Sequence, residues 1–382
     1  TELDEMIERA YKEPRITYLT SIEYPSRTVA SPIQITKTAE QFSKLLGNKF
    51  CLVVSSATGL EGTNYTETKA EIYKKLHLTT FFYLFWLIRY LRGKDGPHHI
   101  FYSRDQRLTA LLLFLRTIAK YQYRVVFEYH ILYSFYLDRF ISRNSDLLVA
   151  ITTGLKDFLV NHFNINQDKI LVAPDGVDLL EFEIPDDQEG YRNQLGLPAH
   201  KKIVGYVGTL STLGMEKGIY TILRSAKHLE SRKDILFYVV GIKKSEIEKY
   251  GQTIQEFGLE DKVKLVEYQP REQVPRYLKS FDVLLMAFPQ KEHFARFMSP
   301  LKMFEYMASN VPIITSDLPA IREVLSENEA VFVAPSDFAG LSQAIVDTLN
   351  HSQKAKVMAE NAIHKVKNYT WTLRAKSIVH FI

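Results

Sequence analysis

Strand-like apolar runs alternate with helix-like amphipathic stretches along most of this chain. In the first half, the runs RITYLT and FCLVVSS are separated by the stretch ASPIQITKTAEQFSKLLG. Short apolar runs bounded by turn residues are typical of buried strands, and longer segments with a period of about 3.6 residues are typical of helices. Strands that alternate with helices form right-handed βαβ units around a buried parallel sheet. The alternation therefore predicts an α/β fold.

The predicted strands fall into two groups. They are 15–20, 50–56, 98–104, 123–130, 146–152 and 169–176, followed by 202–210, 235–241, 263–269, 282–288, 311–317 and 330–335. Between the groups lies an acidic, turn-rich stretch, Asp175 to Lys202, which we interpret as a linker with a short helix. With 382 residues the chain is too long for one ordinary core. We predict an N-terminal domain at 1–178, a C-terminal domain at 179–366, and a helix at 367–382 that packs back toward the first domain.

The composition argues against several classes of protein. Hydrophobic residues make up 46% and charged residues 24%, as in soluble globular proteins. The net charge is only +4, which argues against a nucleic-acid partner. The single Cys51 rules out an intrachain disulfide and a Cys-rich metal site. We see no secretory signal, and no apolar run reaches the roughly 18 residues that span a bilayer. We therefore expect a cytoplasmic protein.

The segment VGYVGTLSTLGMEKGIYTILRSAKHL joins a strand end to a helix start. The strand ends at Gly208, and the helix begins near Lys217. Glycine lets the backbone approach a ligand closely, and a helix N-terminus favours phosphate. Lys217 would add a charge for a diphosphate. An ordinary turn with a solvated lysine fits the same residues, because the spacing matches no P-loop.

A second segment, FMSPLKMFEYMASNVPIITSD, contains another helix start. Ser299 and Pro300 end the preceding segment, since proline is tolerated in a first helical turn. Leu301 and Lys302 then present free backbone N–H groups. Glu305 lies about one turn further on, where its carboxylate can accept both hydroxyls of a ribose while the amides and Lys302 face phosphate. The alternative is that Glu305 only stabilises the helix dipole.

A third group of polar residues follows the strands of the first domain. In VFEYH, strand alternation places Glu128 and His130 on one face. Charged groups at the end of a buried strand are costly unless they are paired or used, so this pair is either structural or part of a site. Arg27 and Arg104 follow two other strands, and each is either a contact to sugar or acceptor or a solvated loop charge.

In this order the segments resemble the retaining nucleotide-sugar glycosyltransferases of the GT-B fold, specifically glycosyltransferase family 4. The resemblance is carried by EKGIYTILRSAKHL, FYVVG, VKLVEYQPREQVPRYLKSFDVLLMAF and SPLKMFEYMASNVPIITSDLPAIREVL, and by SDLLVAITTGLKDFLVNHFNINQDKILVAPDGVD in the first domain. It covers most of residues 140–345, whereas the first 125 residues match only by pattern. It implies two Rossmann-like, doubly wound domains that face each other across a cleft. It also implies a hexosyltransferase of polysaccharide biosynthesis.

The resemblance implies that the C-terminal domain binds the donor, a UDP- or GDP-sugar. Glu305 would hold the ribose, Lys217 the diphosphate, and His130 of the N-terminal domain the transferred sugar. The further donor-binding positions are Gly208, Thr209, Gly241, Tyr268, Ser299, Pro300, Leu301 and Lys302. Arg27, Arg104 and Glu128 are the candidate contacts to sugar or acceptor. The family needs no cofactor or metal, because protein cations and dipoles stabilise the leaving diphosphate.

Three positions depart from the family pattern. Phe297 replaces a glutamate that contacts sugar hydroxyls, Thr209 replaces an arginine on the diphosphate, and Pro300 replaces a glycine that has an N–H group. Our hypothesis is that Lys302 supplies the missing cation. Two alternatives to glycosyl transfer stay open. One is a nucleotide-sugar epimerase or hydrolase of the same fold, and the other is a non-catalytic relative that binds a nucleotide sugar.

The implied reaction is a front-face displacement. The diphosphate leaves, an acceptor hydroxyl attacks from the same side of the sugar, and the departing phosphate takes the proton. The implied acceptor is a glycan or a lipid-linked glycan. An aromatic, basic helix at Phe81–Arg92 therefore has two interpretations. It either makes peripheral contact with the inner face of a membrane, or it is a core helix that flanks the sheet of the first domain with its basic end in water.

Overall fold

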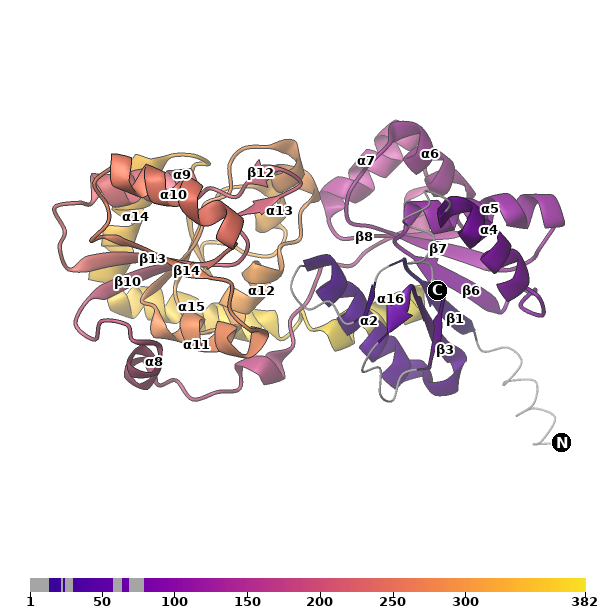
Figure 1. Ribbon diagram of the computed structural model, residues 1–382, viewed down its shortest axis with the longest axis horizontal. Coiled ribbons are helices and arrows are strands. Elements are labelled where there is room, and N and C mark those ends of the chain that lie inside the picture. The colour runs from indigo at the N-terminus through magenta and orange to yellow at the C-terminus, as the bar shows by residue number, and fades with distance from the viewer. Residues whose placement is uncertain (1–13, 22, 25–29, 58–63, 69–78) are drawn as a thin grey trace. The chain divides into compact units, whose positions relative to one another are not determined.

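A computed structural model describes residues 14–21, 23–24, 30–57, 64–68 and 79–382. The chain divides into two compact units (Figure 1). Unit 1 consists of Thr1–Pro174 together with Trp371–Ile382, and unit 2 consists of Asp175–Thr370. The end of the chain therefore belongs to the same unit as its N-terminal half.

A parallel sheet forms the centre of unit 1. In the described part of this unit the strand order is β5-β3-β1-β6-β7-β8-β9, and all neighbouring strands are parallel. The strands are β1 (Arg15–Leu19), β3 (Phe50–Val54), β5 (Tyr65–Glu67), β6 (His99–Ser103), β7 (Arg124–Tyr129), β8 (Leu147–Ala150) and β9 (Ile170–Val172), with a separate short pair β2 (Glu23–Tyr24) and β4 (Ser56–Ala57). The chain builds the sheet first on one side of β1 and then on the other, as in doubly wound folds.

Helices cover the sheet of unit 1. They are α2 (Ala30–Leu46), α4 (Thr79–Tyr90), α5 (Gln106–Ala119), α6 (Phe135–Asn144), α7 (Thr153–Phe163) and α16 (Trp371–Phe381), with 3-10 turns at Gly47–Lys49 and Gln167–Lys169. The C-terminal helix α16 packs against α2. Its residues Ala375 and Ile378 join the core cluster that contains Phe42 and Phe50. Apolar packing therefore holds the last helix on unit 1.

The sheet of unit 2 has the same design. Its strand order among the described residues is β14-β13-β10-β15-β16-β17, again all parallel. The strands are β10 (Lys202–Val207), β13 (Ile235–Ile242), β14 (Val263–Glu267), β15 (Val283–Met286), β16 (Ile313–Ser316) and β17 (Val331–Val333), with a hairpin of β11 (Ser211–Thr212) and β12 (Met215–Glu216). The direction of building reverses between β10 and β15, so the switch point lies beside the end of β10.

Both faces of the unit 2 sheet are buried. On β10, Ile203 and Val207 belong to one core cluster, whereas Val204 and Tyr206 belong to a second cluster. Successive strand residues point to opposite faces, so these two clusters lie on the two sides of the sheet. The helices are α8 (Gln188–Leu195), α9 (Ile219–His228), α10 (Lys244–Glu256), α11 (Val274–Ser280), α12 (Leu301–Ala308), α13 (Pro319–Arg322), α14 (Phe338–Asn350) and α15 (Ser352–Val366), with 3-10 turns at Leu179–Phe182 and Arg271–Gln273 and a π-helical turn at His293–Phe297.

Side chains at the helix ends explain where several helices begin and stop. Asp105, Thr152 and Asp337 precede α5, α7 and α14, and each side chain accepts a hydrogen bond from a backbone N–H of the first turn. Such N-caps satisfy amides that have no partner within the helix. Asn164 ends α7 with a φ of 55°, a left-handed conformation that asparagine tolerates.

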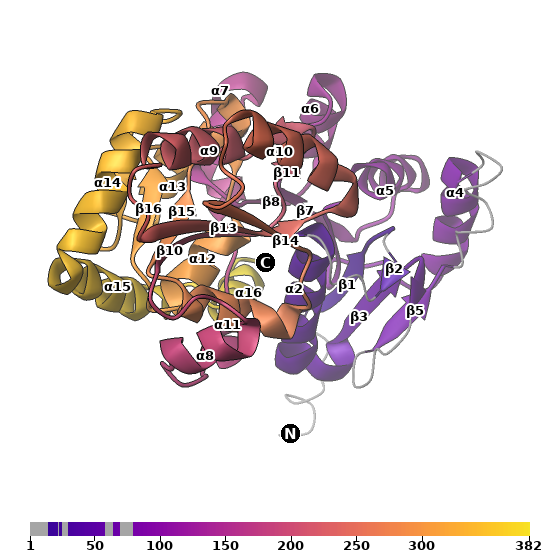
Figure 2. The same cartoon turned by 60° about the vertical axis from the view of Figure 1, so that its left-hand side comes forward.

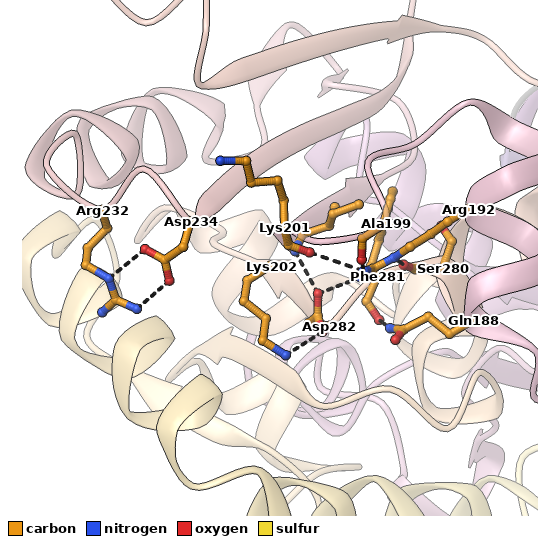
Figure 3. Close-up of polar contacts among 11 residues, drawn as sticks. Gln188, Arg192, Ala199, Lys201, Lys202, Arg232, Asp234, Ser280, Phe281 and Asp282 are labelled. Atoms are coloured by element: carbon orange, nitrogen blue, oxygen red, sulfur yellow. Dashed lines mark hydrogen bonds and ion pairs between the residues drawn. The ribbon is translucent and has the colours of Figure 1, made fainter.

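Arg192 of α8 fastens the acidic stretch to unit 2 (Figure 3). Its Nε donates to the carbonyl of Ser280 at 2.8 Å, and its Nη2 lies 2.6 Å from a carboxylate oxygen of Asp282. Its Nη1 donates to the carbonyls of Ala199 and Lys201. The predicted linker with a short helix is therefore an anchored part of unit 2.

The predicted fold class is confirmed. Each strand predicted from the apolar runs is present, and most end one to three residues earlier than predicted. The short strands β2, β4, β5, β11 and β12 were not predicted, because two or three residues give no readable alternation.

Candidate functional site

Two glycines lie together at neighbouring strand ends of unit 2. Gly208 directly follows β10 with a φ of 135°, and Gly241 near the end of β13 has a φ of 105°. A Cβ atom on Gly241 would lie 2.8 Å from the carbonyl oxygen of Gly208. Only glycine fits this close backbone approach. It lies beside the switch point of the sheet, where ligands bind in doubly wound folds.

The side chain of Lys302 fills the space beside Gly208. A Cβ atom on Gly208 would lie 3.2 Å from Lys302 Nζ. This ammonium group lies 3.5 Å from the centroid of the Tyr206 ring and 5.6 Å from that of Phe288. It has no hydrogen-bond acceptor among the described residues, although Lys302 is only 7% exposed. Burial, and then the positive charge of Lys217, lowers the pKa of Lys302 well below its usual value.

Tyr306 joins α12 to the end of β10. Its hydroxyl accepts a hydrogen bond from the backbone N–H of Val207 at 2.8 Å and donates to the Val207 carbonyl at 3.1 Å. Tyr306 therefore satisfies the backbone N–H and carbonyl of Val207, as an adjacent strand would. Pro300 is the N-cap residue of α12 and offers no capping side chain, so no side chain occupies the amides of Leu301 and Lys302. Unoccupied amides at a helix start favour an anion.

Lys217 lies at the other side of the Gly208 loop. Its Nζ donates to the hydroxyl of Thr209 at 2.8 Å. Burial, together with the nearby charge of Lys243, lowers the pKa of Lys217 to about 8. A cation with a lowered pKa gains free energy when an anion binds beside it. The two cations Lys217 and Lys302 therefore both lie beside the Gly208–Thr209 segment, an arrangement suited to an anion.

A carboxylate of the chain itself accepts hydrogen bonds from the start of α9, where the sequence predicted phosphate. The backbone N–H of Ile219 donates to the carboxylate of Glu216. The Gly218 and Tyr220 amides also interact with this carboxylate, and burial raises its pKa despite these bonds. Glu216, the residue before Lys217, therefore caps the start of α9 itself.

Glu305 is buried on α12 and paired. Its Oε1 accepts a hydrogen bond from Nη1 of Arg271, and Arg271 Nε lies 2.8 Å from a carboxylate oxygen of Glu181. Tyr268, three residues before Arg271, is 43% exposed. Ser299 lies on the loop before α12, and its hydroxyl accepts a hydrogen bond from the backbone N–H of Asp175 at 3.0 Å. The predicted donor-binding residues of unit 2 thus lie on the loops at the ends of β10, β13 and β14 and at the start of α12.

In unit 1, Glu128 is the centre of a buried polar cluster. Its carboxylate accepts hydrogen bonds from Tyr102 and from Arg374 Nη2, the latter at 2.7 Å, and it also contacts His130 Nε2. Burial alone would raise the pKa of Glu128, but Arg374 and His130 more than offset this and hold it well below its usual value. The predicted Glu128–His130 pairing is present.

His130 stays neutral at physiological pH. Burial, and then the charge of Arg104, lowers its pKa to about 4 against the opposing effect of Glu128. Arg104 Nη1 donates to Gln34 Oε1 at 2.9 Å, so its guanidinium is held inside unit 1. The predicted contact residue Arg27 lies outside the described residues.

The comparisons with known proteins identify the C-terminal half. The family model described as glycosyl transferases group 1 matches residues 187–365. This part of the chain is similar to the group 1 glycosyltransferases, and we call residues 187–365 the group 1 domain. This group 1 domain occupies most of unit 2 and includes the Gly208 loop, Lys302 and Glu305.

Curated relatives match about three fifths of this chain. The D-inositol 3-phosphate glycosyltransferases of Corynebacterium efficiens and Corynebacterium diphtheriae are 22% and 25% identical over 62% of this chain and 55% of their own length. Spore coat protein SA of Bacillus subtilis is 25% identical over 61% of this chain and 63% of its own. The alignment thus spans little more than half of the corynebacterial relatives.

Solved structures extend the likeness beyond the group 1 domain. Sucrose-phosphate synthase from Thermosynechococcus elongatus matches with a TM-score of 0.79 at 18% identity, over 97% of this chain and 98% of that one. Anabaena HepE in complex with UDP and glucose matches with a TM-score of 0.74 at 15% identity, over 96% and 99%. These likenesses confirm the GT-B fold for the whole chain.

Sequence reasoning missed two residues of the group 1 domain. Tyr306 supports the end of β10, and Arg271 holds Glu305. Tyr306 follows Glu305 in the sequence, which predicts an aromatic residue in a helix. The local sequence does not predict its contact with the end of β10. Arg271 gave no signal, because 34 residues separate it from Glu305. No group of His, Cys, Asp and Glu among the described residues of either unit is arranged to hold a metal.

Helix α4 is not apolar and buried on all sides. Leu87 is fully buried, but Phe81 and Phe85 are 65% and 70% exposed. The neighbouring α5 also exposes Phe114 and Ile118. Helix α4 thus buries one side, which includes Tyr83 and Leu87, and exposes the other. None of the helices in the described part of the chain combines the length and apolarity needed to cross a membrane.

Proposed function

We propose that this protein is a retaining glycosyltransferase that moves a sugar from a UDP- or GDP-sugar to a hydroxyl of a glycan or lipid-linked acceptor. One observation carries the proposal. The ammonium of Lys302 is buried beside Gly208 without a hydrogen-bond acceptor among the described residues. A buried charge without a partner costs free energy, and a bound anion would supply that partner. The diphosphate of a nucleotide sugar is such an anion.

The other groups of unit 2 fit the remaining parts of this donor. Lys217 and the first amides of α12 would contact the diphosphate together with Lys302. Glu305 would accept from the ribose hydroxyls, and Tyr268 would lie near the base. The Anabaena HepE structures contain UDP and UDP-glucose, which supports a nucleoside diphosphate sugar as the donor class. The protein requires no metal in this proposal.

The mechanism follows from where charge develops. The bond between the sugar C1 and the diphosphate oxygen breaks, and the released negative charge is stabilised by Lys302, Lys217 and the helix start. The acceptor hydroxyl forms the new bond to C1 on the same face, and its proton passes to the departing phosphate. Neutral His130 would orient the transferred sugar through a hydrogen bond. The configuration at C1 is retained because leaving and entering oxygens use one face.

A metal-free binding screen tests the donor class. Melting temperatures are measured with EDTA and with UDP, GDP or ADP, because a ligand of the native state raises the transition by mass action. One nucleotide is expected to give a clear shift, which Glu305→Gln and Lys302→Met reduce. Lys264→Met is a matched control, since Lys264 only donates to the carbonyl of Glu260 on the surface. A lack of any shift would overturn the proposal and favour a non-catalytic protein.

Turnover assays then separate the enzyme classes. The protein is incubated with the selected nucleotide sugar, with and without glycan acceptors, and the sugar C1 signal is followed by NMR. Transfer with retention is the expected result. Release of free sugar or isomerisation without an acceptor would instead assign a hydrolase or an epimerase.

We also propose that unit 1 docks on an anionic membrane surface at the cytoplasmic side, where a lipid-linked acceptor would lie. Phe81, Phe85 and Ile88 follow one face of α4, and Phe114 and Ile118 follow one face of α5. The two helices lie side by side (Figure 2). Their sequences contain arginines but no Asp or Glu. Exposed aromatic residues together with basic charge are complementary to anionic headgroups.

Vesicle sedimentation tests the docking surface. The wild type is expected to sediment with phosphatidylglycerol vesicles and not with pure phosphatidylcholine. Phe85→Asp combined with Phe114→Asp should abolish this binding. Leu180→Asp is the matched control, because Leu180 is a 74% exposed apolar residue of unit 2. Equal sedimentation of the wild type and the double variant would overturn the docking proposal.

A further inference from the structure

Arg271 connects three separate segments of unit 2. It belongs to the 3-10 turn that follows β14, and its guanidinium pairs with Glu305 on α12 and with Glu181 on the turn Leu179–Phe182. The side chain of Arg271 is 21% exposed, and that of Glu305 is 11% exposed. The contact is therefore largely shielded from solvent, where ion pairs are stronger than on the open surface.

The pairing leaves part of Glu305 open. Among the described residues, Arg271 donates a hydrogen bond to Oε1 of Glu305, and no donor contacts Oε2 of Glu305. An ionised carboxylate has about four acceptor positions, so Arg271 occupies one and leaves the others for further donors. A ribose offers two hydroxyl donors and can bind without displacing Arg271.

The planar shape of its side chain suits arginine to orient a carboxylate. A guanidinium is planar and donates in fixed directions, so it determines the orientation of the carboxylate that it contacts. Here a second carboxylate, Glu181, holds Nε at 2.8 Å and fixes the guanidinium itself. The charges of Glu305 and then Glu181 raise the pKa of Arg271 although burial lowers it, so the cation persists at any working pH.

We propose that Arg271 is a positioning residue that orients the Glu305 carboxylate toward the ribose of the donor, with Glu181 as its anchor. This inference rests on the proposed function, because it takes Glu305 to be the ribose acceptor. It adds that ribose recognition depends on a residue that touches no part of the donor. Arg271 keeps Oε2 and the remaining lone pair of Oε1 aimed at the hydroxyls.

The test compares ribose with deoxyribose ligands. Dissociation constants are measured by calorimetry for UDP, 2′-deoxy-UDP and 3′-deoxy-UDP, and for the guanine series in parallel. In the wild type, loss of a hydroxyl bonded to Glu305 is expected to weaken binding roughly ten- to a hundred-fold, as for other hydrogen bonds to charged groups. Glu305→Gln should bring the ratio of the two dissociation constants, deoxy ligand over UDP, close to one.

The variants of Arg271 then decide the inference. Arg271→Gln and Arg271→Lys are each expected to lower this ratio of dissociation constants at least about three-fold. The lysine variant keeps the charge of Arg271 but not its planar fork. Glu181→Gln keeps both Arg271 and Glu305, so it should lower the ratio less. Arg276→Lys is the matched control, because Arg276 lies about one turn further on and, within the described part of the chain, its side chain hydrogen-bonds to Gln273 at 3.4 Å.

A purely structural ion pair would behave differently. It would change the melting temperature and the affinity for all three ligands alike, and the ratio would stay at its wild-type value in both Arg271 variants. That outcome, with the ratio lost only in Glu305→Gln, overturns the inference and leaves the proposed function intact. A wild type that binds UDP without distinguishing the deoxy ligands would overturn both the ribose role of Glu305 and the role of Arg271.

Discussion

The ammonium of Lys302 lies 3.5 Å from the centroid of the Tyr206 ring, on the strand that ends at Gly208. The ring face attracts the cation, but it does not replace a hydrogen-bonded anion. Lys302 is therefore placed by the fold in a position that is costly without a ligand. Residues of this kind contribute to binding at the expense of stability.

Lys302→Met should separate these two effects. The substitution keeps the length of the side chain and removes the buried charge. We expect an unchanged or higher free energy of unfolding without ligand, because an apolar side chain suits the contact with Tyr206 and Phe288. The affinity for the donor nucleotide should fall roughly ten- to a hundred-fold, the loss of a charge-assisted contact. Urea unfolding and calorimetry measure the two quantities, and a large loss of stability with full affinity would contradict the role of Lys302.

Nucleotide affinity should fall as the pH rises through about 8, the pKa to which burial lowers Lys217. Below this pH Lys217 is charged before binding. Above it the ligand-free lysine is neutral, and binding must take up a proton because the bound anion raises the pKa. Linkage then weakens affinity by up to about ten-fold per pH unit, while the phosphates stay ionised because their last pKa is about 6.

The control for this titration is Lys217→Met. It should bind more weakly at pH 7 and lose the inflection near pH 8. The lowered pKa of Lys302 acts in the same direction, so a residual decline with pH is expected in this variant. An affinity that rises with pH in the wild type would rule out the cationic site.

Gly241→Ala should impair both folding and binding. The residue has a φ of 105°, and its new methyl group would lie 2.8 Å from the Gly208 carbonyl oxygen. Backbone strain of this kind costs about 1–3 kcal/mol, and displacement of Gly208 would also move the anion position. Gly258→Ala is the comparison, because Gly258 has a φ of 64° with no atom within 4 Å of the added carbon. It should lose roughly 1 kcal/mol of stability and keep its nucleotide affinity.

Arg374→Met should destabilise unit 1 strongly. It removes the guanidinium from the fully buried carboxylate of Glu128 and leaves that charge without its main counter-ion. Breaking a buried pair typically costs about 3–5 kcal/mol, whereas replacing both partners costs less. The double variant with Glu128→Gln should therefore be more stable than Arg374→Met alone, as measured by urea unfolding.

The pH dependence of this pair has a defined sign. The folded-state pKa of Glu128 lies well below its usual value of 4.5, so its stabilising contribution is present above pH 4.5 and is lost as the pH falls. The stability difference between the wild type and Arg374→Met should accordingly shrink under acid conditions. A difference that is constant from neutral to acid pH would show that Arg374 acts through packing alone.

The elements of the fold were readable from local sequence. The run KIVGYVGTL predicted a strand, and β10 occupies Lys202–Val207 with its side chains buried on alternate faces. The pair SP before LKMFE predicted the start of α12, which begins at Leu301. Such predictions succeed because the period of apolar residues and the chemistry of a helix start depend on neighbours a few residues away.

The pairing of the charged residues was not readable in this way. The sequence by itself determined the α/β alternation and the places of most strands. Only the tertiary structure decided that Arg271 contacts Glu305 and Glu181, that Arg374 contacts Glu128 246 residues away, and that Lys302 is left without an acceptor among the described residues. The physical reason is that these contacts depend on which strands lie next to one another in the sheets. Strand order results from the packing of whole units, whereas apolar periodicity records only local preference.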